Sequence, residues 1–212
     1  MNHRPICFDM DGVIVDSEPS HFEAFRQTFQ PLGIRLTDEQ YQLFFAGKTD
    51  EQGFVDFLAH IERPLGIKTL QAIKRHNYQK LVETTVEPYP TTVMTISQLA
   101  IKHPLALVTS SPESQVSAIL DRFGLQEHFS VLVTAESVIN GKPDPESYLL
   151  AAEMLGRPAA DCIAVEDAPS GISAAKRAGM YCVALTTTHS ADRLGQADRV
   201  VEKLSAELFA RL

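Results

Sequence analysis

The alternation of strand-type and helix-type segments after Pro90 constrains the fold of this chain most strongly. Short apolar runs with the length and composition of buried strands lie at 105–108, 131–133, 162–165, 181–185 and 199–201. Apolar residues recur at helical spacing between them, around 93–99, 116–123, 148–155 and 169–178. Parallel strands need such helical crossovers, so the pattern predicts an α/β fold with a mostly parallel sheet and helices on both faces.

One more strand is predicted at Ile6-Cys7-Phe8, and it has no partner nearby in the sequence. It is therefore expected to join the same sheet. The stretch 16–87 shows only helical patterns, so we expect a core of residues 1–15 and 88–212 that carries an inserted helical unit. Two sequences in the insert are typical of helix N-termini, Ser20-His21-Phe22-Glu23 and Thr37-Asp38-Glu39-Gln40.

Composition limits the classes of partner. The 212 residues carry a formal net charge of −8, and lysine and arginine form no stripe, which argues against nucleic acid or an anionic membrane as the main partner. No apolar stretch reaches membrane-spanning length, and no signal peptide is predicted. The odd number of cysteines, all in strand-like runs (Cys7, Cys162 and Cys182), indicates buried thiols in a reducing compartment. A cytoplasmic monomer is expected.

Two carboxylates follow the first strand in Asp9-Met10-Asp11-Gly12. Glycine favours a sharp turn, so the strand is expected to end there and leave the two acids crowded. Crowded carboxylates repel each other unless a proton or a cation intervenes, and Mg²⁺ prefers such oxygen ligands. A solvated acidic turn is the alternative, and it is the commoner interpretation of this short pattern taken alone.

Polar residues follow three further strands of the predicted sheet: Thr109-Ser110-Ser111, Gly141-Lys142-Pro143 and Glu166-Asp167. Ligands bind at the carboxyl ends of parallel strands, so these groups are expected to converge with Asp9 and Asp11. Each has a purely structural alternative, namely helix caps for the hydroxyls, an exposed lysine, and acids that favour a helix N-terminus. Their joint occurrence at one sheet edge favours a functional site.

Such a site has the parts for phosphoryl transfer. Asp9, Glu166 and Asp167 would hold Mg²⁺, and Lys142 would neutralise a phosphate. Thr109 and the backbone N–H groups of 110–111 would form an anion seat. Asp9 would attack phosphorus, and Asp11 would transfer protons to the leaving oxygen and from water.

These motifs resemble those of the haloacid dehalogenase superfamily: Asp9-x-Asp11-Gly12-Val13-x-Val15-Asp16, Thr109, Gly141-Lys142-Pro143-x-Pro145 and Glu166-Asp167. The resemblance is strongest to its β-phosphoglucomutase-like and sugar-phosphate phosphatase branch. It implies a Rossmann-like core with an inserted helical-bundle cap that sets specificity. It further implies Asp9 as nucleophile, Asp11 as acid and base, Thr109 and Lys142 as phosphate-binding residues, and Mg²⁺ held by Asp9, the Asp11 carbonyl, Glu166 and Asp167. Ser110, in the predicted anion seat, is expected to bind phosphate with them.

The resemblance also implies a set of cap residues that face the substrate: His21, Gly47, Lys48, Thr49, Lys74 and Asn77. A solvated lysine and a helix-capping threonine are the structural alternatives. β-Phosphoglucomutases carry an arginine where this chain has Asp50, and the reversed charge favours a phosphatase for a small phosphomonoester such as a sugar phosphate. A phosphosugar mutase is the second hypothesis. A non-enzymatic phosphoaspartate switch is the third, but signalling receiver domains place their acid pair first in sequence.

Overall fold

A computed structural model describes residues 3–46 and 48–212, so the predicted cap residue Gly47 lies outside the described residues. The chain divides into two compact units, one of Met1–Asp16 with Glu87–Leu212 and one of Ser17–Val86. Each boundary lies one residue from the boundary expected from the sequence. No helix in the described part of the chain combines the length and apolarity that a membrane crossing requires.

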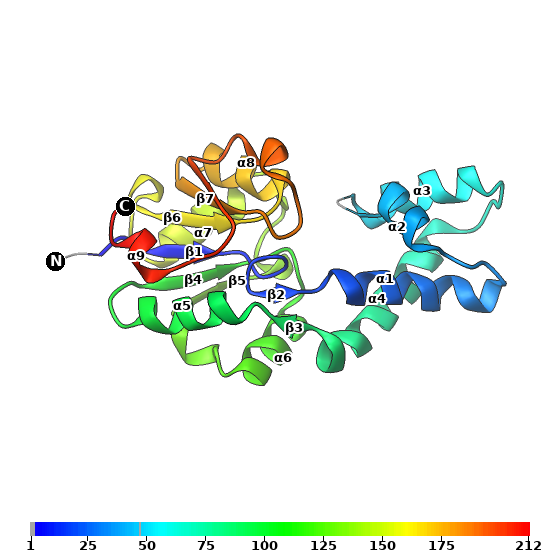
Figure 1. Ribbon diagram of the computed structural model, residues 1–212, viewed down its shortest axis with the longest axis horizontal. Helices are drawn as coiled ribbons and strands as arrows, with labels where there is room; N and C mark the ends of the chain where they lie inside the picture. The colour runs from blue at the N-terminus through cyan, green and yellow to red at the C-terminus, as the bar shows by residue number, and fades with distance from the viewer. Residues whose placement is uncertain (1–2, 47) are drawn as a thin grey trace. The chain divides into compact units, whose positions relative to one another are not determined.

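The larger unit is built on a six-stranded sheet whose strands all pair in parallel. Its strands, in spatial order, are β5 (Val131–Val133), β4 (Leu105–Val108), β1 (Ile6–Phe8), β6 (Ile163–Glu166), β7 (Tyr181–Leu185) and β8 (Arg199–Val201). β1 thus joins the other strands as predicted, and it lies between β4 and β6 (Figure 1). This order brings the loops that follow β4, β1, β6 and β7 to neighbouring positions at one sheet edge.

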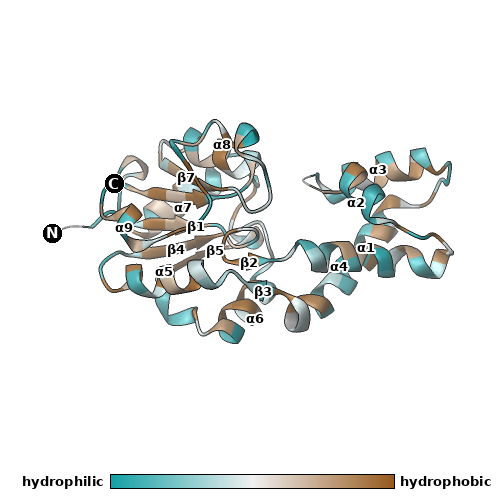
Figure 2. Ribbon diagram, viewed as in Figure 1, coloured by the Kyte–Doolittle hydropathy of each residue, from teal (hydrophilic) through white to brown (hydrophobic). Residues whose placement is uncertain are grey.

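Helices cover both faces of this sheet, which confirms the predicted fold class. Alternate strand residues such as Cys7, Ala106 and Ala164 pack in one apolar cluster with α7 (Glu146–Met154) and α8 (Pro169–Arg177). On the opposite face the ring of Phe8 contacts that of Phe209 in α9 (Ala206–Phe209), which packs against α5 (Pro90–Ala100). The strands are mostly apolar in Figure 2 because both faces are covered. The remaining core helix is α6 (Glu113–Phe123).

The smaller unit contains four α-helices among its described residues: α1 (Glu18–Phe29), α2 (Asp38–Phe44), α3 (Asp50–His60) and α4 (Ile67–Thr85). Aromatic rings fill its core, and the ring centroids of Phe25 and Phe45 lie 4.2 Å apart. Thr37 caps α2 as predicted, since its side chain accepts from Gln40 N–H and the Gln40 side chain accepts from Thr37 N–H.

Two local predictions were wrong. Ser20 does not cap a helix: α1 begins at Glu18, and the Ser20 hydroxyl lies inside it, bonded to Thr85 Oγ1 at 2.9 Å. The insert was also expected to be helical from residue 16 to residue 87. Instead β2 (Val15–Asp16) and β3 (Glu87–Pro88) form a short antiparallel pair, a two-residue ladder too short to give an alternating pattern. All three cysteines are free and buried, as predicted.

Candidate active site

The chain turns sharply after β1, and Asp9 and Asp11 lie on this turn. Gly12 has φ +75°, a conformation that residues with a side chain rarely adopt, and its N–H donates to the Val15 carbonyl at 2.8 Å. Asp9 Oδ1 accepts a bond from Lys142 Nζ at 2.9 Å, whereas Asp11 Oδ2 accepts one from Ser111 Oγ at 2.8 Å. The turn therefore gives its two carboxylates different surroundings.

Asp9 forms an acidic cluster with Glu166 and Asp167 from the end of β6. One ligand atom from each lies within 4.8 Å of the others, and all three residues are at most 9% exposed. β6 ends one residue later than predicted, so Glu166 is its last residue and Asp167 begins the following loop. An all-oxygen donor set of this kind suits Mg²⁺ rather than a soft metal.

The cluster is electrostatically unfavourable without a cation. Burial raises the pKa of Asp9 well above its ordinary value; Lys142 opposes the shift, while Glu166 and Asp167 add to it. Burial and the neighbouring Glu166 also raise the pKa of Asp167 to about 7. A divalent cation among these oxygens would offset the burial and the repulsion that together raise both pKa values.

Lys142 is the positive charge already present in this cluster. Its Nζ donates to Asp9 Oδ1 at 2.9 Å, to Glu166 Oε1 at 2.7 Å and to the Val108 carbonyl at 2.9 Å. Burial alone would lower the pKa of Lys142, but the two carboxylates raise it above its ordinary value. The exposed-lysine alternative does not apply, because only 8% of this side chain is exposed.

The loop after β4 differs in one respect from the predicted anion seat. Thr109 is buried, and its Oγ1 accepts a bond from the Ser111 N–H at 3.0 Å. That N–H was expected to be available to an anion, but it is used within the turn. Ser110 is exposed, and α6 begins only at Glu113.

Three side chains that contact the site residues were not predicted. The Tyr148 hydroxyl donates to Glu166 Oε1 at 2.6 Å, Thr188 Oγ1 donates to Asp167 Oδ2, and Thr187 Oγ1 donates to the Gly12 carbonyl. The two threonines follow β7, so the strand-end argument applied to residues 186–188 could have found them. Tyr148 gives no such signal, because it occupies an apolar position of a predicted helix.

Two predicted cap residues, His21 and Lys74, lie together within the smaller unit. Lys74 Nζ is 2.9 Å from His21 Nδ1 and donates to Asp50 Oδ1 at 3.0 Å. The His21 ring stacks on Tyr78 with centroids 4.0 Å apart, and burial lowers the pKa of His21 well below its ordinary value. Lys74 is 3% exposed, so it is not a solvated lysine.

The other described cap candidates have separate partners. Lys48 pairs with Asp56 at 3.0 Å. Thr49 caps α3, because its side chain accepts the Gln52 N–H at 3.2 Å, as the structural alternative proposed. Asn77 donates to Thr28 Oγ1 at 3.2 Å. Among the described cap candidates, the side chains of His21 and Lys74 lie in direct contact.

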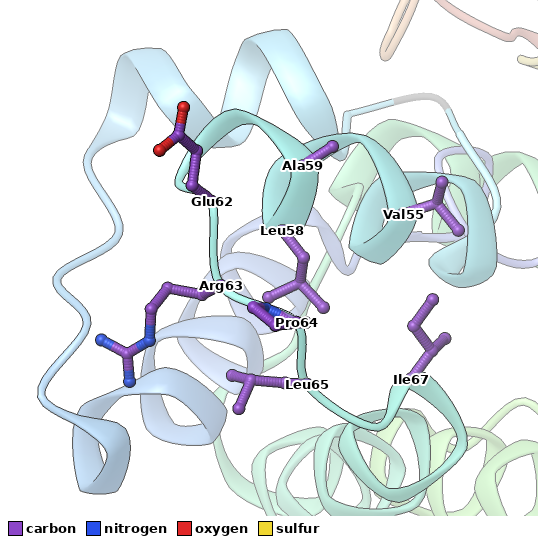
Figure 3. Close-up of a pocket in the computed structure, with 8 residues that line it drawn as sticks. All are labelled: Val55, Leu58, Ala59, Glu62, Arg63, Pro64, Leu65 and Ile67. Atoms are coloured by element: carbon purple, nitrogen blue, oxygen red, sulfur yellow. The ribbon is translucent and has the colours of Figure 1, made fainter.

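The smaller unit also contains an apolar hollow of about 390 Å³. It is formed by α3, the start of α4 and the segment between them (Figure 3), and is lined by Val55, Leu58, Ala59, Glu62, Arg63, Pro64, Leu65 and Ile67. None of the predicted site residues that the structure describes lines it. The candidate active site is therefore the acidic cluster of the larger unit.

The raised carboxyl pKa values predict how stability depends on pH. Between its unfolded pKa near 4 and its folded pKa near 7, the Asp167 carboxyl binds more protons in the folded chain than in the unfolded chain. This carboxyl therefore contributes stability to the metal-free protein at pH 5 that is lost as pH rises to 7.5, whereas the lowered pKa of His21 acts in the opposite direction below about pH 6.5. Added MgCl₂ should raise the unfolding temperature more at pH 7.5 than at pH 5, because protons compete with the cation. Thermal unfolding at both pH values measures this, and an equal Mg²⁺ effect at both would contradict the cluster's electrostatics.

Comparison with known proteins agrees with this geometry. The sequence profile described as Haloacid dehalogenase-like hydrolase matches residues 6–185. Validoxylamine A 7'-phosphate phosphatase of Streptomyces hygroscopicus subsp. limoneus is 34% identical over 207 residues, covering 96% of this chain and 95% of that protein. Fructose-1-phosphate phosphatase YqaB of Escherichia coli is 31% identical, covering 84% and 94%. The crystal structure of CbbY from Rhodobacter sphaeroides with phosphate superposes with a TM-score of 0.80 at 28% identity, covering 97% and 96%.

Proposed function

The chain belongs to the haloacid dehalogenase-like hydrolases, and we propose that it is a Mg²⁺-dependent phosphatase that hydrolyses a small phosphomonoester through an aspartyl-phosphate on Asp9. The observation that carries this proposal is the buried cluster in which Asp9 meets both an acid pair and the Lys142 ammonium. A nucleophilic carboxylate needs such counter-charge before a phosphate dianion can approach it.

Each side chain has a defined part in this proposal. The Asp9 carboxylate attacks phosphorus, and the bond from phosphorus to the ester oxygen breaks. Asp11 protonates the departing oxygen, then takes a proton from the water that hydrolyses the aspartyl-phosphate. Lys142, Thr109 and Ser110 bind phosphate oxygens. Asp9, the Asp11 carbonyl, Glu166 and Asp167 would hold Mg²⁺, which when bound supplies positive charge at the phosphate.

The proposal favours a phosphatase over a mutase because of the charges in the inserted unit. Both described lysines of the predicted cap set are ion-paired, Lys74 with Asp50 and Lys48 with Asp56. A second phosphate on the substrate would have to compete with these carboxylates, and it would meet Asp50 where a mutase has an arginine. The charge pattern thus favours a substrate with a single phosphate. Nothing in this charge pattern favours a non-enzymatic phosphoaspartate switch.

A sugar or polyol phosphate is the proposed substrate class, selected by the inserted unit. By their names, two relatives are phosphatases of validoxylamine A 7'-phosphate and of fructose 1-phosphate. This similarity supports a polyhydroxylated phosphate ester as the substrate of this chain. The acidic composition supports a small metabolite rather than nucleic acid. We propose that the enzyme acts as a cytoplasmic monomer.

Release of phosphate from a panel of sugar phosphates, polyol phosphates and nucleotides tests this function. We expect release from at least one sugar or polyol phosphate, dependent on Mg²⁺ and absent with EDTA. Interconversion of β-glucose 1- and 6-phosphates should be much slower than hydrolysis. Faster interconversion would establish the mutase instead, and preference for nucleotides would contradict the substrate class.

A further inference from the structure

Each member of the acid pair at the end of β6 receives a hydrogen bond from one hydroxyl. Tyr148, fully buried on α7, donates to Glu166 Oε1 at 2.6 Å. Thr188, exposed in the loop after β7, donates to Asp167 Oδ2. The two donors come from different elements, and none of the roles in the proposed reaction uses either of them.

Each carboxylate of the pair also lies against a glycine. A Cβ atom on Gly171 would overlap the Glu166 carboxylate, and a Cβ atom on Gly12 would overlap that of Asp167. Glu166 is therefore confined between the Tyr148 hydroxyl and the start of α8, and Asp167 between the Thr188 hydroxyl and the turn after β1. Both carboxylates are thus limited to one orientation.

The bonds around Thr188 have a defined direction. A hydroxyl has one proton, and a carboxylate that binds a cation is ionised and only accepts, so in the metal-bound protein Thr188 Oγ1 would give its proton to Asp167. His189 Nδ1, 2.9 Å from the same oxygen, must then be the donor to Thr188. Thr187 bonds the Gly12 carbonyl, so this loop holds both Asp167 and the turn that bears Asp9.

We propose that Tyr148 and Thr188 are positioning residues of the metal site. Each bonds one oxygen of its carboxylate and thereby fixes the rotation of that carboxylate beside Asp9. Lys142 bonds the same Glu166 oxygen as Tyr148. Buried carboxylates of like charge would otherwise turn apart, and a cation would have to bring them together again on binding. Partners of this kind typically contribute 10- to 100-fold to metal affinity. This inference rests on the proposed function, because it concerns the proposed Mg²⁺ site.

Three substitutions separate the hydroxyls from the packing of their side chains. Thr188→Val removes the hydroxyl and keeps the shape, and Thr188→Ser keeps the hydroxyl and removes the methyl group. Tyr148→Phe keeps the ring, which lies 5.1 Å from Lys142 Nζ. Titration of each full-length protein with MgCl₂ in a calorimeter, without substrate, gives the dissociation constant directly.

We expect Thr188→Val and Tyr148→Phe to weaken Mg²⁺ binding at least about tenfold, and Thr188→Ser to stay within about threefold of wild type. At saturating Mg²⁺, KM for the phosphate ester should stay unchanged in all three. Wild-type affinity in Thr188→Val and Tyr148→Phe would overturn the inference, as would equal weakening by Ser and Val at Thr188.

The two proposals fail in different ways. Wild-type protein that releases phosphate but binds no Mg²⁺ would overturn the metal site, and the positioning role with it. Wild-type protein that binds Mg²⁺ but hydrolyses no ester would overturn the phosphatase and leave the positioning role to be decided by the variants. If Tyr148→Phe fails to fold, the Val and Ser variants at the exposed Thr188 still decide.

Discussion

Asp9→Asn is expected to lower kcat at least about 10⁴-fold, the scale on which enzymes respond to loss of a nucleophile. The amide has almost the same shape as the carboxylate, but its oxygen is neutral and does not displace an alkoxide from phosphorus. Phosphate release at saturating substrate and Mg²⁺ measures the loss. Asp121→Asn, the same chemical change on the exposed face of α6, is the matched control and should keep full activity.

The same substitution should leave the fold intact and even stabilise it. Burial and the neighbouring acids raise the pKa of Asp9, so its charge is a source of instability in the metal-free protein. Lys142 keeps its bonds to Glu166 and to the Val108 carbonyl when Asp9 loses its charge. The unfolding temperature at pH 7.5 should therefore equal or exceed that of wild type. An inactive variant that is also strongly destabilised would mean that Asp9 is structural.

Lys142→Met should impair both activity and stability. The side chain keeps its length and its apolar stem, but Asp9 and Glu166 lose their shared counter-charge inside the protein. Removal of one partner from a buried ion pair typically costs about 3–5 kcal/mol of unfolding free energy. The loss of positive charge beside the phosphate should lower kcat by about 10²- to 10³-fold.

The pH dependence distinguishes this account from simple loss of packing. The pKa of Asp167 is raised to about 7 and that of Asp9 is also raised, so the cluster carries less negative charge at pH 5 than at pH 8, and Lys142→Met should be less destabilising at pH 5. Lys176→Met is the control, because Lys176 pairs with Asp198 where both are about one-third exposed, and such pairs contribute at most about 1 kcal/mol. Equal destabilisation of the Lys142 variant at both pH values would contradict the electrostatic role.

The sequence predicted the sheet well because buried parallel strands are continuous apolar runs, and the chain has few competing runs. The sequence predicted that the polar residues after the strands lie close together. For Asp9, Thr109 and Glu166 this prediction depends on strand order, and in the structure β1 lies between β4 and β6. Strand order alone does not explain the position of Lys142, which follows β5, because β5 is not adjacent to β1. The long Lys142 side chain nevertheless reaches Asp9.

Tertiary contacts account for what the sequence did not predict. Ser20 has the spacing of a helix cap, but its hydroxyl bonds Thr85 on α4, 65 residues away. Tyr148 lies on an apolar helical face, and nothing in the local pattern indicates that its hydroxyl reaches Glu166. The pairing of Lys74 with Asp50 likewise depends on how α3 and α4 pack, not on their sequence spacing.

The aspartyl-phosphate is the central claim, and trapping it on Asp9 tests that claim most directly. Asp11→Asn keeps the nucleophile but lacks the acid that speeds formation of the intermediate and the base that activates water, so with a long incubation the aspartyl-phosphate should form slowly and then persist. This variant is mixed with the best ester and Mg²⁺, quenched in acid and digested, and its peptides are weighed by mass spectrometry. We predict that the peptide bearing Asp9 gains one phosphoryl group, and that the gain is absent when Asp9→Asn is added. Phosphate release by wild type with no phosphoryl group on that peptide, or with one on another residue, would contradict the account.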